Sequence, residues 1–335
     1  METRQLGRTG LRVPVLCLGT MTFGLQCDRA TSFAILDAAM EGGITFLDTA
    51  DVYPLGGTAL TVGRTEEILG QWMAERGNRD DLVLASKCMG PMGRGPNDWG
   101  LSRLHLQRAV EASLRRLRTD VIDLYQTHFF DPRTPIAETL RALDDLQRAG
   151  KVRYAGCSNS PAWRLAEALA AAERLGAEGY VSVQPRYNLL YREIETELLP
   201  LCRARGLGVL PYNPLAGGFL SGKHAPGGDP TSGTRFTLGT AAEIYQRRYW
   251  QEAQFQAVER LRKEAEARGH ALASVAIKWV LDQPGISSAI IGASRPAQLA
   301  ASLAAPSLAI DAELARALDE AWWTLPRRPV DEGYR

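Results

Sequence analysis

The chain alternates between short apolar runs and longer segments in which apolar residues recur every three or four positions. The apolar runs predict strands at 15–18, 44–48, 82–86, 121–126, 152–157, 181–183, 207–210 and 288–291. The segments with helical spacing fall at 31–40, 64–73, 102–117, 136–149, 161–175, 193–205, 251–268, 271–282, 296–303 and 311–321. A turn at residues 7–11, read G-R-T-G-L, predicts a small hairpin ahead of the first of these strands. Thr65 is expected to cap the second helix.

Strands that are apolar throughout and separated by helices are typical of a parallel sheet buried on both faces. About eight strand–helix units follow one another, and no G-x-G-x-x-G comes after the first strand. The pattern therefore predicts an α/β fold, a closed (β/α)8 barrel rather than an open sheet. No linker interrupts it, so residues 1–335 are expected to form a single barrel domain. Two long segments, 88–101 and 213–250, are expected to be functional loops at the C-terminal face.

Composition narrows the classes of protein to which this chain can belong. Apolar residues make up 45% and charged residues 23% of the 335 positions, enough for a large core. The net charge is +1 and the Lys and Arg residues are scattered, which argues against a nucleic-acid partner. The start, M-E-T-R-Q-L-G, lacks an apolar signal core, and no apolar run reaches membrane length. No C-x-x-C pair occurs among the five cysteines, so buried reduced thiols and a cytoplasmic location are expected.

Polar or ionisable residues stand where the predicted strands end, and these ends share one face of a barrel. They are Asp48, Lys87, His128, Ser158, Asn159, Gln184, Tyr212 and Asn213. Each has an ordinary structural explanation: a carboxylate can form a turn, a lysine can extend into solvent, and a histidine or tyrosine can simply pack. Their joint occurrence on consecutive strands favours a shared site.

Tyr53, five residues after Asp48, suggests proton chemistry at this site. A tyrosine hydroxyl titrates near pH ~10 when unperturbed, and a neighbouring ammonium lowers that value. Lys87 could supply the ammonium, and Asp48 the counter-charge that a buried lysine needs. Tyr53 is therefore a candidate acid, and His128 could orient a carbonyl by hydrogen bonding. The four histidines lack ligand spacing, so no metal site is expected.

A set of motifs spans nearly the whole chain. They are L-G-T-M-T-F-G (18–24), L-D-T-A-D-V-Y (47–53), S-K-C (86–88), L-Y-Q-T-H (124–128), G-C-S-N (156–159), Q-P-R-Y-N (184–188), P-Y-N-P-L-A-G-G-F-L-S-G-K (211–223) and I-I-G-A-S-R-P-A-Q-L (290–299). In this order they resemble the aldo-keto reductase superfamily, especially its longer bacterial members and its potassium-channel β-subunit branch. The resemblance implies that Asp48, Tyr53, Lys87 and His128 form the catalytic tetrad. Tyr53 would donate a proton while NADPH delivers a hydride to a carbonyl carbon.

The same resemblance implies a set of contacts with NADP(H). Ser158, Asn159 and Gln184 match the residues that bind the nicotinamide amide, and Tyr212 matches the aromatic residue that stacks on the ring. The other implied contacts are Thr20 and Met21 near the ribose, Asn213, Pro214, Leu215, Gly217 and Lys223 around the pyrophosphate, Arg235 near the adenosine, and Gly292, Ser294 and Gln298 at the 2′-phosphate, with Asp48 also among them. The loop after the last strand leads into a helix N-terminus, which favours anions. Arg295 and Lys223 add positive charge, so NADP(H) is favoured over NAD(H).

One departure concerns the adenine. Family members often continue this region as Q-L-x-E-N, whose Glu and Asn bind the base, whereas this chain has Ala301 and Ser302. Ser302 remains the candidate contact, and adenine is expected to be held more weakly or by other means. Substituting Ser302→Asn is expected to tighten NADPH binding.

The substrate is expected to be a small-molecule carbonyl compound with apolar or aromatic character. Candidate pocket residues are Phe23, Met89, Trp99, Phe129, Phe130, Tyr187 and Trp250, although each could equally pack a loop, and Arg133, Arg186 and Arg192 could add charge. One alternative is an NADP-binding regulator that resembles channel β subunits, in which the tetrad histidine is replaced; the presence of His128 favours turnover. An aldolase using Lys87 would leave the dinucleotide residues unexplained. The branch includes homo-oligomers, but no surface motif decides the oligomeric state.

Overall fold

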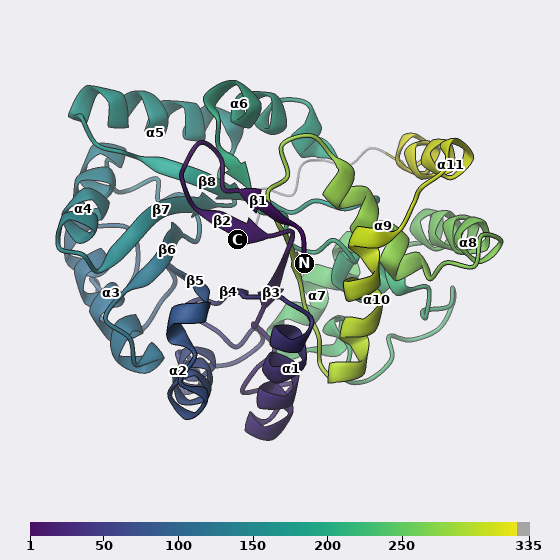
Figure 1. The fold of residues 1–335 in the computed structure, drawn as a ribbon, viewed down its shortest axis with the longest axis horizontal. Coiled ribbons are helices and arrows are strands. Elements are labelled where there is room, and N and C mark those ends of the chain that lie inside the picture. The colour runs from purple at the N-terminus through teal and green to yellow at the C-terminus, as the bar shows by residue number, and fades with distance from the viewer. Residues whose placement is uncertain (327–335) are drawn as a thin grey trace.

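The computed structural model describes residues 1–326, and eight short strands form one parallel sheet in it (Figure 1). In order around the sheet they are β10 (Ala289–Ile291), β3 (Leu16–Gly19), β4 (Phe46–Asp48), β5 (Val83–Cys88), β6 (Ile122–Thr127), β7 (Val152–Ser158), β8 (Tyr180–Gln184) and β9 (Gly208–Val209). The two edges meet, since the Ser287 amide donates to the Val209 carbonyl at 2.9 Å and the Ile290 amide donates to the Pro211 carbonyl at 2.8 Å. The sheet thus curls onto itself, and the arrangement fits the predicted (β/α)8 barrel.

The helices lie around the outside of this sheet (Figure 1). They are α1 (Arg29–Glu41), α2 (Arg64–Arg76), α3 (Arg103–Leu117), α4 (Ile136–Arg148), α5 (Ala162–Leu175), α6 (Leu198–Arg205), α7 (Ala242–Tyr249), α8 (Glu252–Glu266), α9 (Leu272–Asp282), α10 (Leu299–Ala304) and α11 (Ala312–Trp323). Side chains cap several of them, as where the Ser102 hydroxyl accepts from the His105 amide at 3.3 Å. Among residues 1–326, no helix has the length and apolar character needed to cross a membrane.

An N-terminal hairpin closes one end of the barrel, as the turn at residues 7–11 predicted. It consists of β1 (Thr3–Gln5) and β2 (Arg12–Pro14), which pair antiparallel. Leu6 and Val13 are fully buried and belong to the apolar cluster that fills the barrel, together with Phe46, Ala85 and Leu124. The hairpin therefore seals the N-terminal end, which leaves the opposite end for a site.

Some predicted details were wrong. Thr65 does not cap α2; Gly63 occupies that position with φ 87°, and the Thr65 hydroxyl donates to the Phe23 carbonyl at 2.8 Å. The segment 193–205 was predicted to be one helix, but it forms a short 3-10 helix at Glu193–Glu195 and then α6. Proline is tolerated only in the first turn of an α-helix, so Pro200 fixes where α6 begins. The segment 213–250 was expected to be a loop, yet it contains α7.

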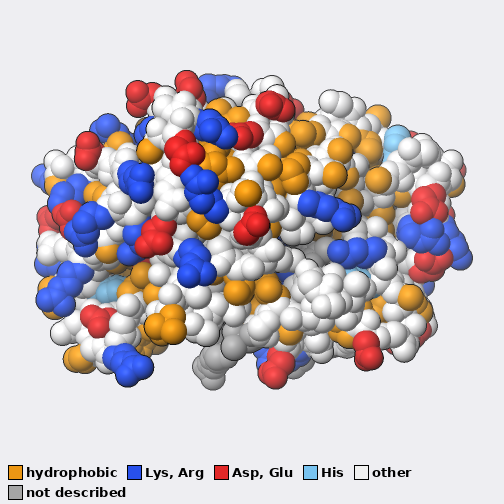
Figure 2. Space-filling model, turned by 90° about the horizontal axis from the view of Figure 1, so that it is seen from below, with side chains coloured by type: hydrophobic (Ala, Val, Ile, Leu, Met, Phe, Trp, Pro, Cys, Tyr) orange, Lys and Arg blue, Asp and Glu red, His pale blue; other side chains and the backbone are white. Residues whose placement is uncertain are grey.

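Opposite charges are mixed on the surface. Figure 2 shows Lys and Arg side chains interspersed with Asp and Glu over the face that it presents, next to an apolar area. Opposite charges also pair within single helices, such as Lys278 with Asp282 at 2.7 Å in α9. This face carries no broad field of one sign, in agreement with the scattered charge in the sequence.

We predict that Leu124→Ala lowers the free energy of unfolding by about 3 kcal/mol, since it removes apolar volume from the barrel interior. Urea unfolding followed by circular dichroism would measure the change. Leu60, which is 93% exposed, is the matched control, and Leu60→Ala should change stability by less than about 0.5 kcal/mol. Equal effects of the two substitutions would contradict the interior position of Leu124.

Candidate active site

The twofold period of the strands carries polar groups into the open end of the barrel. Asp48, Lys87 and Gln126 each follow an interior apolar residue by two positions, these residues being Phe46, Ala85 and Leu124. Residues two apart in a strand share a face. The same alternation that builds the apolar interior therefore directs these three polar side chains inward at the end of their strands.

Asp48 and Lys87 form a buried ion pair. The Lys87 Nζ atom lies 2.5 Å from Asp48 Oδ1, and the two side chains are 0% and 4% exposed, respectively. Nζ also donates to the Thr49 carbonyl at 2.8 Å. A buried ammonium needs a counter-charge and hydrogen-bond acceptors to remain charged. The predicted pairing of Asp48 with Lys87 is confirmed by this geometry.

Two side-chain amides hold the other oxygen of Asp48. Gln184 Nε2 donates to Oδ2 at 2.8 Å, and Gln126 Nε2 donates to it at 3.1 Å. Gln184 was predicted as a cofactor contact, but Gln126 was given no role from the sequence. An uncharged polar residue inside an apolar strand was the signal that could have identified it, since a buried amide must find partners.

Tyr53 and His128 stand beside this pair. The Tyr53 hydroxyl lies 3.5 Å from Lys87 Nζ, and its ring meets the His128 ring edge-on with centroids 5.8 Å apart. The His128 amide donates to the Cys88 carbonyl at 2.9 Å, which fixes the imidazole at the end of β6. Although its edge reaches the cavity, burial of most of the ring, and then the charge of Lys87, hold the pKa of His128 well below its usual range. The imidazole is therefore neutral near pH 7.

A second hydrogen-bond network links β7 to the loop after β9. The Tyr212 hydroxyl donates to Asn159 Oδ1 at 2.8 Å, and Asn159 Nδ2 donates to the His128 carbonyl at 3.1 Å. The Ser158 hydroxyl donates to the Gln184 carbonyl at 2.8 Å. Asn159 also adopts a left-handed backbone with φ 50°, a conformation that asparagine tolerates better than most residues. The network orients the Tyr212 ring and ties it to the segment that carries His128.

A cavity of about 380 Å³ extends from Tyr53 and His128 to α10. Every residue that the resemblance assigned to the cofactor lines this cavity, from Thr20 to Ser302. Its volume lies within the range of about 300–1,000 Å³ that small-molecule and cofactor sites occupy. Thr22, Gln26 and Ile291 also line it, although they are not among the residues that the resemblance assigned to the cofactor.

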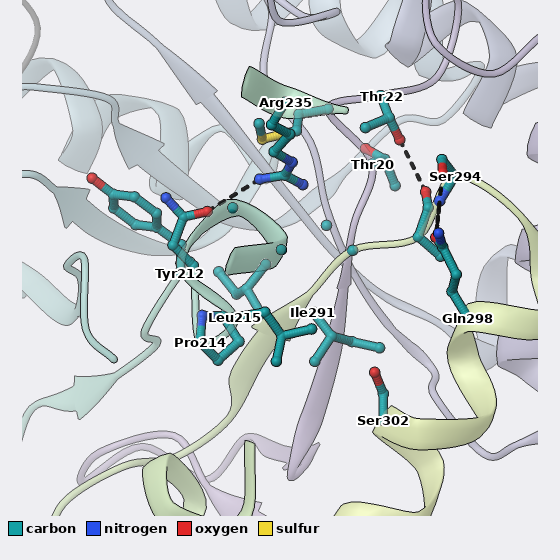
Figure 3. A pocket seen from close by; sticks show the side chains of 18 of the residues that line it. Thr20, Thr22, Tyr212, Pro214, Leu215, Arg235, Ile291, Ser294, Gln298 and Ser302 are labelled. Carbon is teal, nitrogen blue, oxygen red and sulfur yellow. Dashed lines mark hydrogen bonds between the residues drawn. The ribbon is translucent and has the colours of Figure 1, made fainter. Parts of the chain in front are cut away.

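Arg235 lines the cavity and is held by two side chains. Its Nη1 atom donates to Asn213 Oδ1 at 3.1 Å and to the Tyr245 hydroxyl at 3.3 Å; Figure 3 shows the bond to Asn213 as a dashed line from the labelled Arg235. A Cβ at position 292 would lie 2.9 Å from Arg235 Nη2, so Gly292 leaves the room that the guanidinium needs. Gly217, with φ 73°, lies under Tyr245 in a similar way, since a Cβ there would come within 2.5 Å of the ring.

Lys223 and Arg295 place two positive charges at the cavity wall. Partial withdrawal of the Lys223 ammonium from water, and then the charge of Arg295, lower the pKa of Lys223. Like charges held together in this way favour an anion between them. Nearby, the Ser294 amide donates to Gln298 Oε1 at 2.8 Å (Figure 3). Glycine-lined space and convergent cations therefore fit a phosphate-bearing dinucleotide.

The aromatic residues proposed for the substrate lie mostly elsewhere. Phe23 and Tyr187 are buried, and Trp250 packs into a cluster with Phe219 and Phe236. Phe129 stacks on His128 with ring centroids 5.0 Å apart and is thus beside the site. Large aromatic side chains satisfy core packing as readily as a pocket, which is why the sequence did not separate the two uses.

The loops after β5 and β6 meet through charged groups. The Arg133 guanidinium lies 3.2 Å from the centroid of Trp99, and Leu101 donates its amide to Asp131 at 3.0 Å. Arg192, in contrast, pairs with Glu195 and Asp319 away from this mouth. Of the three arginines considered for the substrate, Arg133 therefore contacts a residue proposed for the substrate pocket, Trp99.

The described residues contain no group of three or more His, Cys, Asp or Glu side chains that could hold a metal ion. All five cysteines are free thiols in buried positions. Burial raises the pKa of the Cys202 thiol to about 12, so it stays protonated near pH 7.

Comparison with known proteins agrees with this geometry. Residues 15–322 match the Aldo/keto reductase family. An uncharacterized oxidoreductase, YrpG, from Bacillus subtilis (strain 168) is 42% identical over 325 residues, covering 96% of this chain and 95% of that protein. A probable voltage-gated potassium channel subunit beta from Arabidopsis thaliana is 38% identical over 89% of each chain. Norsolorinic acid reductase A from Aspergillus parasiticus is 32% identical, covering 97% of this chain and 80% of that protein. With a match of this extent, the chain belongs to the aldo/keto reductase family.

Proposed function

We propose that this protein is an NADPH-dependent oxidoreductase that reversibly reduces aldehyde or ketone groups of small molecules to alcohols, with Tyr53 as the proton donor. One observation carries the proposal: the buried Asp48–Lys87 pair places its ammonium 3.5 Å from the Tyr53 hydroxyl, at one end of a dinucleotide-sized cavity. The similarity to YrpG and to norsolorinic acid reductase A supports an oxidoreductase.

Lys87 makes Tyr53 a better proton donor. When the phenol gives its proton to the developing alkoxide, its own oxygen becomes negative, and the adjacent ammonium stabilises that charge. Because Lys87 is 0% exposed, water does not screen this interaction strongly. Asp48, held by Gln126 and Gln184, keeps the ammonium in place.

His128 serves as a neutral hydrogen-bonding group in this proposal. Burial and the charge of Lys87 lower the pKa of His128, so the imidazole can present one N–H to a carbonyl oxygen without adding a full positive charge. Tyr53 and His128 would then contact the same oxygen, since both line the same cavity and their ring centroids lie 5.8 Å apart. This arrangement fixes the carbonyl at the point where the proton is delivered.

The chain's own residues would hold NADP(H) along the cavity. Tyr212 offers a ring face, and Ser158, Asn159 and Gln184 surround the place for the carboxamide. Lys223, Arg235 and Arg295 offer positive charge for phosphates. When bound there, the reduced nicotinamide supplies the hydride that the carbonyl carbon accepts.

The second candidate function is a non-catalytic or weakly catalytic NADP-binding regulator. The similarity to the probable potassium channel subunit beta of Arabidopsis thaliana is the observation that favours it. Both functions need the same cavity, but only turnover needs Tyr53. Oxidation of NADPH, followed at 340 nm against a panel of aldehydes and ketones, separates them, since binding without turnover would favour the regulator.

We further propose that residues 1–335 act as one barrel unit in a reducing, cytoplasmic environment. Continuity of the sheet from β3 to β10 and the free buried thiols support this view. The final residues of the predicted unit, 327–335, lie outside the described range.

We predict that Tyr53→Phe lowers the turnover number by about 100-fold or more, because the proton donor is removed. NADPH should still quench tryptophan fluorescence, since the ring and the cavity remain. Tyr154→Phe, near the N-terminal end of strand β7 and away from the mouth, is the control and should retain activity. Undiminished turnover in the Tyr53 variant would remove Tyr53 as the acid.

The lowered pKa of His128 predicts a pH-dependent stability. An unfolded histidine binds a proton below pH ~6.5, whereas folded His128 resists it, so the unfolded state takes up more protons as the pH falls. The free energy of unfolding should therefore decrease below pH ~6.5. Urea titrations at several pH values give the free energy of unfolding at each pH. This free energy should fall less steeply with decreasing pH in His128→Gln than in the wild type or in His270→Gln. An unchanged slope would mean that His128 titrates normally.

The paired cations predict a preference for the phosphorylated cofactor. Arg295→Gln should weaken NADPH binding about 10-fold and leave NADH binding nearly unchanged, because a charge-assisted hydrogen bond to phosphate is lost. Fluorescence titration with both nucleotides measures the two dissociation constants. Arg262→Gln, at a surface ion pair on α8, is the control. Equal losses for NADPH and NADH would show that Arg295 does not contact the 2′-phosphate.

A further inference from the structure

Small side chains line the part of the cavity beside α9 and α10. Ala273 from α9, Ala297, Ala301 and Ser302 contribute there, together with Ile291 at the end of β10. Figure 3 shows Ser302 on the opposite side of the cavity from Tyr212, with its hydroxyl directed toward Ile291. This part of the cavity thus offers an apolar slot with few polar groups.

Several polar groups near the slot are already engaged. Gln298 Oε1 accepts from the Ser294 amide at 2.8 Å and from the Ser294 hydroxyl at 3.3 Å. The Ser274 hydroxyl donates to the Ala301 carbonyl at 2.8 Å, and the Thr22 hydroxyl donates to the Ala293 carbonyl at 3.1 Å. Gln298 therefore keeps only its amide nitrogen, which is a donor, for a ligand.

The other polar side-chain groups near the slot do not select for an amino group on the base. Arg295 and the Gln298 amide nitrogen are donors only, whereas the Ser302 hydroxyl both donates and accepts. The 6-amino group of adenine needs an acceptor, and the 6-oxo group of hypoxanthine needs a donor. Ser302 can serve either group, and the two donors cannot favour the amine.

We infer that this protein holds the base of its cofactor by packing and does not distinguish adenine from hypoxanthine. The inference rests on the proposed function, in which the nicotinamide lies beside Tyr53 and His128, while the slot beside α9 and α10 belongs to the same cavity. Nicotinamide hypoxanthine dinucleotide phosphate, which differs from NADP(H) only by a 6-oxo group and a protonated N1 on the base, is therefore accepted as readily as NADP(H).

Ser302 is the position that sets this tolerance. An asparagine there could accept from the 6-amino group and donate to N7 of adenine at once, whereas hypoxanthine presents acceptors at both places. Ser302→Asn should thus introduce a preference for adenine by tightening NADP(H) binding. Ala304→Asn adds the same amide to an exposed position of the same helix, α10, and is the matched control.

Isothermal titration calorimetry with NADP⁺ and with nicotinamide hypoxanthine dinucleotide phosphate tests the inference without turnover. For the wild type and Ala304→Asn, the two dissociation constants should agree within about threefold. This is a smaller difference than one net hydrogen bond would produce. For Ser302→Asn, the ratio should rise to about tenfold in favour of NADP⁺. The ratio of kcat/KM for the two reduced cofactors should follow the same order.

Failure of the inference and failure of the proposed function give different results. Wild-type binding of NADP⁺ more than about threefold tighter than the hypoxanthine nucleotide would overturn the inference and leave the proposed function standing. Equal binding without reduction of any carbonyl compound would overturn the proposed reductase and leave the inference standing. Absence of binding by either nucleotide would overturn both.

Discussion

The ion pair between Asp48 and Lys87 is the interaction on which the open end of the barrel depends. Removing two charges from water costs several kcal/mol per ion unless the pair is close and the remaining lone pairs are used. The structure meets both conditions, since Nζ lies 2.5 Å from Oδ1, and Gln126 and Gln184 donate to Oδ2. Strands β4, β5, β6 and β8 are thereby joined at one point. An error in the register of any of them would leave a buried charge or amide without a partner.

Chemistry and recognition are built from different parts of the fold. The strands carry Asp48 and Lys87, whose positions are fixed by the sheet and by the apolar interior below them. Loops and the short helix α10 carry the cavity-lining groups that we propose for the phosphates and the base, such as Arg235 and Ser302. Arg235 is held by Asn213 and Tyr245 rather than by the core. Substitutions in these loops are therefore expected to change cofactor binding while the buried Asp48–Lys87 ion pair remains intact.

Much of the fold could be read from the sequence because parallel strands buried on both faces leave a simple apolar signal. The eight strands and most helices were predicted within a few residues, and the resemblance selected cavity residues that are distant in the chain, including Gly292 and Lys223. Errors arose where local signals compete. Thr65 has the side chain of a helix cap, yet tertiary contact with Phe23 uses its hydroxyl. The polar helix α7 lies in a glycine-rich segment whose composition indicates a loop.

By itself, the sequence determined which residues could do chemistry and, through the twofold period, on which face of each strand they stand. It could not determine that Gln126 supports Asp48, because hydrogen bonds between strands depend on register and closure of the sheet. Nor could it separate Phe129, which stacks on His128, from Phe23 and Tyr187, which fill the core. Burial of an aromatic ring follows from how distant segments pack together, and only the tertiary structure contains that information.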